Sequence, residues 1–257
     1  MNLLSVWQRW TAEDPPYVLP EDLPVLDRLE AKITQNWAEA RSSHDFGRPG
    51  DRRLHLGLLP HPFCGDVANA SIYVLMLNPG IGFQDYYGEY DVPEYRDAVL
   101  ANLRQEFPPG VLPFMFLDPR FAWHGGFGWW HGKLVRVIEK LSDAQQLPFA
   151  DARAMLARRL ASIELVPYHS VSFSNSGQIT KKLRSSQLAA SFVRDVVLPK
   201  VRSGQAIVIV TRKVRVWELP DGPGIVKYTG GQALGAHLGP SSPGGKAIIE
   251  HVLRYSV

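Results

Sequence analysis

The chain has 257 residues but only one cysteine, Cys64, and it has no apolar run of the ~18 residues that a membrane-spanning helix needs. A single cysteine excludes an internal disulfide and a four-cysteine iron–sulfur cluster, and it is typical of a reducing compartment. The first residues lack the basic segment and apolar stretch of a secretory signal peptide. These absences predict a cytoplasmic protein with no membrane partner.

The composition is that of an ordinary globular protein, with 45% hydrophobic and 21% charged residues. We expect one α/β domain over residues 1–257, with an N-terminal helical and loop extension at 1–60 and a core at 65–255. No internal repeat divides the chain.

Positive charge is concentrated in one stretch, although the net charge of the whole chain is only +3. Residues 151–215 contain twelve Lys and Arg against three acidic residues, a net charge of +9, whereas the rest of the chain carries −6. This asymmetry favours a polyanionic partner. The alternative is a set of solvated helix faces spread around the surface.

Apolar runs alternate with helical patterns along the core. The runs predict buried strands at residues 72–77, 163–166, 206–210 and 225–228. The patterns predict helices at residues 23–37, 95–105, 132–144, 150–161, 186–201 and 245–254. This alternation predicts a three-layer αβα fold with a central four-stranded, mainly parallel sheet.

The first of these strands ends abruptly in Asn78-Pro79-Gly80. Open α/β sheets bind ligands at the carboxyl ends of their strands, so a polar Asn78 in this place is a candidate site residue. Pro79 and Gly80 form a stiff turn that lets the backbone approach a bound group closely. The alternative is an ordinary strand followed by a turn.

The stretch Leu77-Asn78-Pro79-Gly80 resembles the first catalytic motif of the uracil-DNA glycosylase superfamily. The nearest branch is that of the mismatch-specific and thymine-DNA glycosylases, with Met76 standing where that branch has glycine. The resemblance implies a uracil-DNA glycosylase-like fold. It also implies that Asn78 holds the water that attacks the sugar, and that Pro79 and Gly80 lie against the base.

Hydrolysis of a glycosidic bond would give chemical roles to the residues that come after Gly80. Asp85 is a candidate base or a stabiliser of the cationic sugar, or else it caps the turn at residues 85–88. Tyr86 and Tyr87 are expected to stack on a flipped base. Tyr168 and His169 end the second strand and are expected beside Asn78, contacting the base; the alternative for His169 is a packed histidine.

A second motif is expected in the loop before the last helix. The resemblance implies a loop here that presses into the DNA minor groove. His237 is a candidate for stabilising charge on the leaving base, and Leu238 for an apolar wedge. Ser241, Ser242 and Gly244 offer hydroxyl and backbone donors to phosphates at a helix N-terminus. The alternative is a Gly/Pro loop capped by serine.

Basic residues also precede the helix predicted at 186–201. Lys181, Lys182 and Arg184 are candidate phosphate contacts, or they belong to a solvated loop.

The aromatic stretch at residues 114–130 is either a hydrophobic loop packed on the core or a widened base pocket. His124 and His131 flank Gly125-Gly126 and Gly128 and have no third or fourth ligand at usual spacing, so the sequence predicts no metal site and no cofactor.

These features together predict a monofunctional DNA glycosylase that flips and excises a damaged or modified pyrimidine and leaves an abasic site. A hypermodified phage cytosine, removed as an antiviral defence, is one possible substrate. We expect a monomer whose partner is DNA. The alternatives are a non-catalytic DNA-binding module of the same fold and an N-glycosidase acting on free nucleosides or nucleotides.

Overall fold

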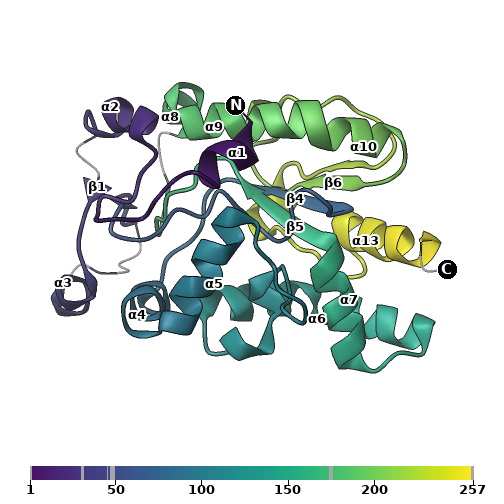
Figure 1. Ribbon diagram of the computed structural model, residues 1–257. Coiled ribbons are helices and arrows are strands. Elements are labelled where there is room, and N and C mark those ends of the chain that lie inside the picture. Colours follow the sequence, from purple (N-terminus) through teal and green to yellow (C-terminus); the bar gives the residue numbers. More distant parts are fainter. Residues whose placement is uncertain (1, 30–31, 45, 47–49, 174–175, 256–257) are drawn as a thin grey trace. The chain divides into compact units, whose positions relative to one another are not determined.

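The computed structural model describes residues 2–29, 32–44, 46, 50–173 and 176–255 (Figure 1). Its contacts divide the chain into two compact units, each assembled from separate stretches of sequence. Unit 1 contains Met1–Phe63, Leu77–Glu106 and Glu164–Phe192, and unit 2 contains Cys64–Met76, Phe107–Ile163 and Val193–Val257. Each unit therefore depends on contacts between segments that are far apart in the chain.

A five-stranded sheet forms the centre of unit 2. Its strands run in the order β3 (Phe63–Cys64), β5 (Leu160–Glu164), β4 (Ile72–Met76), β6 (Ile207–Val210) and β7 (Ile225–Lys227). β4 pairs with β6 in parallel, with Ile72 opposite Ile207, and β6 pairs with β7 in parallel. A strand lies at each of the four predicted places, but β5 begins three residues before the predicted 163–166 and ends at Glu164. β3 makes the sheet five-stranded rather than four-stranded.

Hydrogen bonds at the strand ends fix the direction of β5. The Ser71 amide donates to Arg159 O before the strands, and the Val166 amide donates to Leu77 O after them, so β4 and β5 run in the same direction. β3 runs antiparallel to β5. The residue before β3 lies beside the end of β5, where Glu164 N donates to Pro62 O, and the residue after β3, Gly65, lies against the backbone of Leu160 at the start of β5. Four parallel strands with one antiparallel edge strand confirm the α/β class.

The strands are mostly apolar because helices cover both faces of the sheet. Residues 72–75 of β4 are fully buried, as parallel strands under helices usually are. Figure 1 shows α6 (Gly125–Gln145) and α7 (Phe149–Arg159) on one side of the sheet and α10 (Leu198–Arg202) on the other. The remaining elements of unit 2 are η2 (Met115–Leu117), η3 (Pro119–Phe121), the π-helix η4 (Val193–Val197), α11 (Val214–Trp217), α12 (Gly231–Gly235) and α13 (Pro243–Arg254).

Unit 1 is mainly helical. Its elements are α1 (Leu3–Trp7), η1 (Pro20–Asp22), α2 (Leu23–Leu26), α3 (Trp37–Ser42), α4 (Phe83–Asp91), α5 (Pro93–Arg104), α8 (Ser176–Lys182), α9 (Arg184–Phe192) and a two-stranded sheet of β1 (Lys32–Ile33) and β2 (Leu54–His55). One buried cluster joins Leu26, Leu54 and Tyr168, which come from three distant segments. This cluster holds the segment at residues 166–170 in a fixed place within the unit.

The helix predicted at residues 23–37 is wrong. Helix α2 ends at Leu26, Lys32–Ile33 pairs with Leu54–His55 as β1, and a new helix starts at Trp37. Asn36 explains the break, because its side chain accepts the Glu39 amide at 3.0 Å and thereby caps the next helix. The turn predicted at residues 85–88 is likewise replaced by helix α4.

Within the described parts of the chain, no helix is both long enough and apolar enough to cross a membrane.

Glu164, the last residue of β5, is buried with a carboxylate oxygen, Oε2, that has no hydrogen-bond partner among the described residues. Burial raises the pKa of this carboxyl well above its usual value. The folded state then holds the proton more tightly than the unfolded state, so this group costs stability as the pH rises above about 4.5. We expect Glu164→Gln to raise the free energy of unfolding at pH 7, because glutamine keeps the shape of the side chain and has no charge to bury.

Urea unfolding at pH 5 and pH 8 measures this effect. The gain from Glu164→Gln should be larger at pH 8, whereas Glu106→Gln, at an exposed position, should change little at either pH. A loss of stability in Glu164→Gln at pH 8 would contradict the prediction.

Candidate functional site

The side chain of Asn78 is fixed just after β4, inside unit 1. Its Nδ2 donates to Ser170 Oγ and Pro79 O, both at 2.9 Å, and to Tyr168 O at 3.3 Å. Two of these acceptors are backbone carbonyls, which only accept, so the nitrogen must face them. Asn78 Oδ1 accepts no hydrogen bond from any described residue. This half-buried amide oxygen is therefore positioned to accept a hydrogen bond from water.

The segment 168–170 also holds the backbone of the turn. Ser170 N donates to Pro79 O at 3.2 Å, and His169 Nδ1 lies 2.8 Å from Gly80 O. Because a carbonyl oxygen accepts only, Nδ1 carries the hydrogen in this pair. Gly80 is exposed, and a Cβ placed on it would meet nothing within 4 Å. The turn is thus rigidly held on one side and open on the other.

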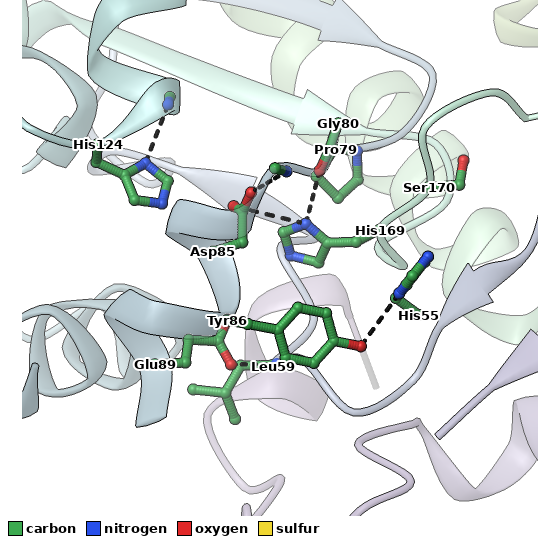
Figure 2. A network of polar contacts seen from close by, with 12 residues as sticks. His55, Leu59, Pro79, Gly80, Asp85, Tyr86, Glu89, His124, His169 and Ser170 are labelled. Carbon is green, nitrogen blue, oxygen red and sulfur yellow. Dashed lines mark hydrogen bonds and ion pairs between the residues drawn. The ribbon is translucent and has the colours of Figure 1, made fainter. Parts of the chain in front are cut away.

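Asp85 and His169 approach each other beside this turn, as Figure 2 shows. Asp85 lies in the first turn of α4, where its Oδ2 accepts the Gly82 amide at 2.7 Å. Its Oδ1 lies 3.9 Å from His169 Nδ1, and the Asp85 side chain is 14% exposed. Asp85 therefore caps the start of helix α4 rather than a turn at residues 85–88, and its exposed fraction leaves the carboxylate accessible for charge stabilisation.

The two tyrosines predicted to contact a base are enclosed. Tyr86 is fully buried with its hydroxyl 3.1 Å from His55 Nδ1, and Tyr168 is buried with its hydroxyl donating to Asp22 Oδ2 at 2.7 Å. A ring enclosed on both faces offers no surface for stacking, so the base-binding roles expected for Tyr86 and Tyr168 are wrong in this structure. Tyr87 is 44% exposed and keeps its place as a candidate stacking residue.

His55 adds a polar group that the sequence did not single out. Its Nε2 lies 3.8 Å from Asp51 Oδ2, and its Nδ1 contacts the Tyr86 hydroxyl. Burial lowers the pKa of His55 to about 4, so the ring is neutral at physiological pH. The neutral ring ties β2 to α4 rather than offering a charge to a ligand.

A cavity of about 480 Å³ lies within unit 2 and brings basic side chains next to the second motif. From α6 it is lined by Trp129, Lys133 and Arg136, which share a helix face because they are spaced four and three residues apart. Lys133 lies 5.0 Å from the Trp129 ring centre and donates to Gly235 O. Burial, together with nearby Arg212, lowers the pKa of Lys133. Two cations in one cavity favour an anionic ligand.

The second-motif loop contributes His237, Leu238, Gly239, Ser241 and Ser242 to the lining of this cavity. His237 and Ser241 are exposed and accessible to a ligand. Leu238 is only 1% exposed, so the wedge role expected for it is wrong in this structure.

The start of α13 uses most of its own donors. Ser242 Oγ accepts the Gly245 amide at 3.0 Å and donates to Gly239 O at 2.8 Å, and the buried Gly244 amide donates to the Tyr228 hydroxyl. Ser242 therefore caps the helix, as the alternative interpretation held, and the phosphate contact expected from the Gly244 amide is wrong in this structure.

The other basic candidates lie in unit 1. Lys181 and Lys182 are exposed in the last turn of α8, and Arg184 is half-buried at the start of α9. Exposed lysines at a helix end are accessible to phosphates but show no preference for one ligand.

The aromatic stretch at residues 114–130 is largely core. Phe114, Phe121 and Trp130 are buried, whereas Trp123 and Trp129 are each 39% exposed. His124 caps α6, because its Nδ1 accepts the Gly126 amide at 3.0 Å. The packed-loop interpretation thus holds for most of the stretch, and Trp129 alone among these residues lines the cavity.

No family model matches this chain. Searches of curated proteins and of solved structures also found no match.

One buried group that could hold a metal was missed from the sequence. His61, Glu89 and His169 each offer a ligand atom, and these atoms all lie within 4.8 Å of one another. Glu89 Oε2 accepts the Leu59 amide at 2.7 Å (Figure 2), and burial raises the pKa of Glu89 well above its usual value. The three residues come from a loop, the helix α4 and the segment after β5, so no spacing in the sequence connects them.

Proposed function

We propose that this protein is a monofunctional DNA glycosylase that hydrolyses the N-glycosidic bond of a damaged or modified pyrimidine. The observation that carries the proposal is the fixed amide of Asn78, whose nitrogen is held by Ser170 Oγ and Tyr168 O while Oδ1 accepts nothing from the described residues. Such an oxygen orients a water molecule without deprotonating it. The uracil-DNA glycosylase-like fold is part of the same proposal.

In the proposed reaction, water held at Asn78 Oδ1 attacks the anomeric carbon of the sugar. The bond from that carbon to the base breaks, and the base leaves with the bonding electrons. The attacking water loses one proton, which reaches the departing base through solvent, so that the products are an abasic sugar and a neutral base. The sugar becomes cationic on the way. The Asp85 carboxylate, fixed by the Gly82 amide, supplies a negative charge near the turn that favours this state.

The distribution of cations supports DNA as the partner. Lys181 and Lys182 are exposed in unit 1, and Lys133 and Arg136 line the cavity in unit 2. Lysine and arginine contacts to phosphates supply most of the sequence-independent affinity for DNA. An N-glycosidase acting on free nucleosides would gain nothing from exposed cations of this kind.

The test is an assay for alkali-labile abasic sites on a panel of DNAs. The panel contains uracil, a mismatched thymine and glucosylated hydroxymethylcytosine, together with genomic DNA from phages with modified cytosines. Release of one base with wild-type protein supports the glycosylase and names its substrate. No abasic sites on any DNA, combined with salt-dependent binding, would replace the proposal with a DNA-binding module. Hydrolysis of free nucleosides alone would replace it with a nucleosidase.

Neutralising the cavity should weaken DNA binding. We expect Lys133→Gln and Arg136→Gln each to weaken binding by about tenfold or more, because a hydrogen bond to a charged group contributes about 1.5–3 kcal/mol. Each should also reduce the slope of log affinity against log salt by about 1. Fluorescence anisotropy between 50 and 200 mM salt measures both quantities, because the affinity of phosphate contacts falls steeply over this interval.

Lys140→Gln is the matched control, because Lys140 is exposed on the same helix but does not line the cavity. Equal losses in all three variants would show a general charge effect and would contradict a specific role for the cavity.

A further inference from the structure

We propose that His61, Glu89 and His169 form a binding site for a divalent transition-metal ion, with zinc as the expected occupant. The ligand atoms of the three residues lie within 4.8 Å of one another, and all three side chains are buried. Zinc is held by imidazole nitrogens at about 2.0–2.1 Å and by carboxylate oxygens at about 2.0–2.2 Å. Ligand atoms this close therefore reach a common ion after only a small side-chain shift.

His169 is already oriented as a metal ligand would be. Its Nδ1 donates to Gly80 O at 2.8 Å, so that the lone pair is on Nε2 whenever the ring carries one proton. Histidines that ligate metals usually donate the other ring N–H to a carbonyl or carboxylate in this way. Asp85 Oδ1 lies 3.9 Å from the same nitrogen, which is too far for a hydrogen bond but places a negative charge beside the ring. The hydrogen bond thus selects the tautomer that a metal requires.

Glu89 supplies the negative charge. Its Oε2 is held by the Leu59 amide, whereas its Oε1 is buried and has no hydrogen-bond partner among the described residues. A buried carboxylate oxygen without a partner is costly unless a cation or a proton compensates it. A divalent ion placed between Glu89 and the two imidazoles compensates the charge directly.

The donor set indicates the kind of ion. Two imidazoles and one carboxylate suit zinc or iron(II), whereas magnesium and calcium prefer oxygen ligands alone. Three protein ligands also leave one position for water or another group. The class of ligand is therefore a borderline divalent transition metal rather than a hard cation.

The same histidine connects the metal site to the Asn78 turn. His169 holds Gly80 O, and its neighbour Ser170 holds both Pro79 O and the Asn78 amide. An ion bound to His169 would stiffen the segment that positions Asn78. The binding site itself does not depend on the glycosylase proposal, because it would exist whatever reaction the turn serves.

The experiment measures metal content and metal affinity directly. Protein made without a metal-affinity tag is analysed by inductively coupled plasma mass spectrometry, stripped with a chelator, and titrated with Zn²⁺ alone and with Co²⁺ alone. We expect one ion per chain, a cobalt absorption spectrum typical of nitrogen and oxygen ligands, and a melting temperature that rises on adding Zn²⁺. Glu89→Gln and His61→Gln should each weaken Zn²⁺ binding by about 100-fold or more, since even residues that only support metal ligands change affinity by about 10- to 100-fold.

Two controls separate this site from adventitious binding. Glu94→Gln, exposed on the neighbouring helix α5, and His237→Ala, exposed in unit 2, should bind Zn²⁺ like the wild type. Two results would each overturn the proposal. One is the absence of stoichiometric Zn²⁺ or Co²⁺ in wild-type protein after reconstitution, and the other is unchanged affinity in Glu89→Gln and His61→Gln. If the wild-type protein binds Zn²⁺ as expected but excises no base in the abasic-site assay, the glycosylase proposal fails and the metal site remains supported.

Discussion

Asn78→Ala is expected to lower the rate of base release by about 100- to 1000-fold, within the range that a positioned catalytic group contributes. The substitution removes the amide oxygen that holds water, while Pro79 and Gly80 remain held by Ser170 N and His169 Nδ1. The variant loses the hydrogen bonds that the two amide hydrogens make to Ser170 Oγ and to backbone carbonyls, so the free energy of unfolding should fall by no more than about 3 kcal/mol. Single-turnover kinetics and urea unfolding give the two numbers.

Asn69→Ala is the matched control, because Asn69 is exposed and its side chain contacts only Asp66 in a turn. It should retain the wild-type rate. Ser170→Ala removes one acceptor of the Asn78 amide and should have an effect between those of the other two variants. Full activity in Asn78→Ala would show that this residue does not position the water and would remove the main support for the proposed reaction.

Long apolar runs made the sheet predictable. Most residues in each of the four strands β4 to β7 are apolar, because helices cover both faces of the sheet. β1, β2 and β3 have two residues each, and such short strands carry no periodicity. Their pairing depends on contacts between distant segments, such as Lys32 with Leu54.

Helix boundaries were less predictable where capping competed with apolar spacing. The apolar residues between Leu23 and Trp37 have the spacing of one face of an amphipathic helix, yet Asn36 caps the start of a separate helix. Helix α4 escaped notice because Gly88 and three tyrosines give it a poor intrinsic preference for helix. Its first turn is stabilised instead by Asp85, which accepts the amide of Gly82.

The candidate site was half predictable for a similar reason. Asn78 and His169 follow neighbouring parallel strands, so their convergence on one edge follows from the topology. His61, Glu89 and His55 come from elements with no such rule, and only the folded chain brings them near His169. The burial of Tyr86 and Tyr168 was equally hidden, because their partners Asp22 and His55 lie far away in the sequence.

Asp22→Ala is expected to reduce the free energy of unfolding by about 2–4 kcal/mol. The Asp22 carboxylate is fully buried, accepts the Tyr168 hydroxyl at 2.7 Å and accepts the Ser185 amide at 3.2 Å. Alanine leaves both donors buried without an acceptor, which is the costly way to lose a hydrogen bond. Asp27→Ala is the control, because Asp27 is 64% exposed and its pair with Lys32 at the surface should contribute less than about 1 kcal/mol.

The dependence on pH separates the charge of Asp22 from its hydrogen bonds. Burial raises the pKa of this carboxyl above its usual value, more than the bonds from Ser185 and Tyr168 lower it. The folded state therefore binds the proton more tightly, and the wild type loses stability as the pH rises above about 4. Asp22→Asn has no such proton, so its stability relative to wild type should improve between pH 4 and pH 7 in urea unfolding experiments.

A double-mutant cycle with Tyr168→Phe tests whether the contact itself carries the stability. If the hydroxyl acts through Asp22, the losses in Asp22→Ala and Tyr168→Phe should overlap by about 0.5–3 kcal/mol, the usual coupling of residues in contact. Strict additivity would show that the two side chains contribute independently. Because Tyr168 O also accepts from the Asn78 amide, a loosened Tyr168 should lower the rate of base release as well as the stability. An unchanged rate in Tyr168→Phe would mean that the backbone at residue 168 is held by the surrounding apolar cluster rather than by its hydroxyl.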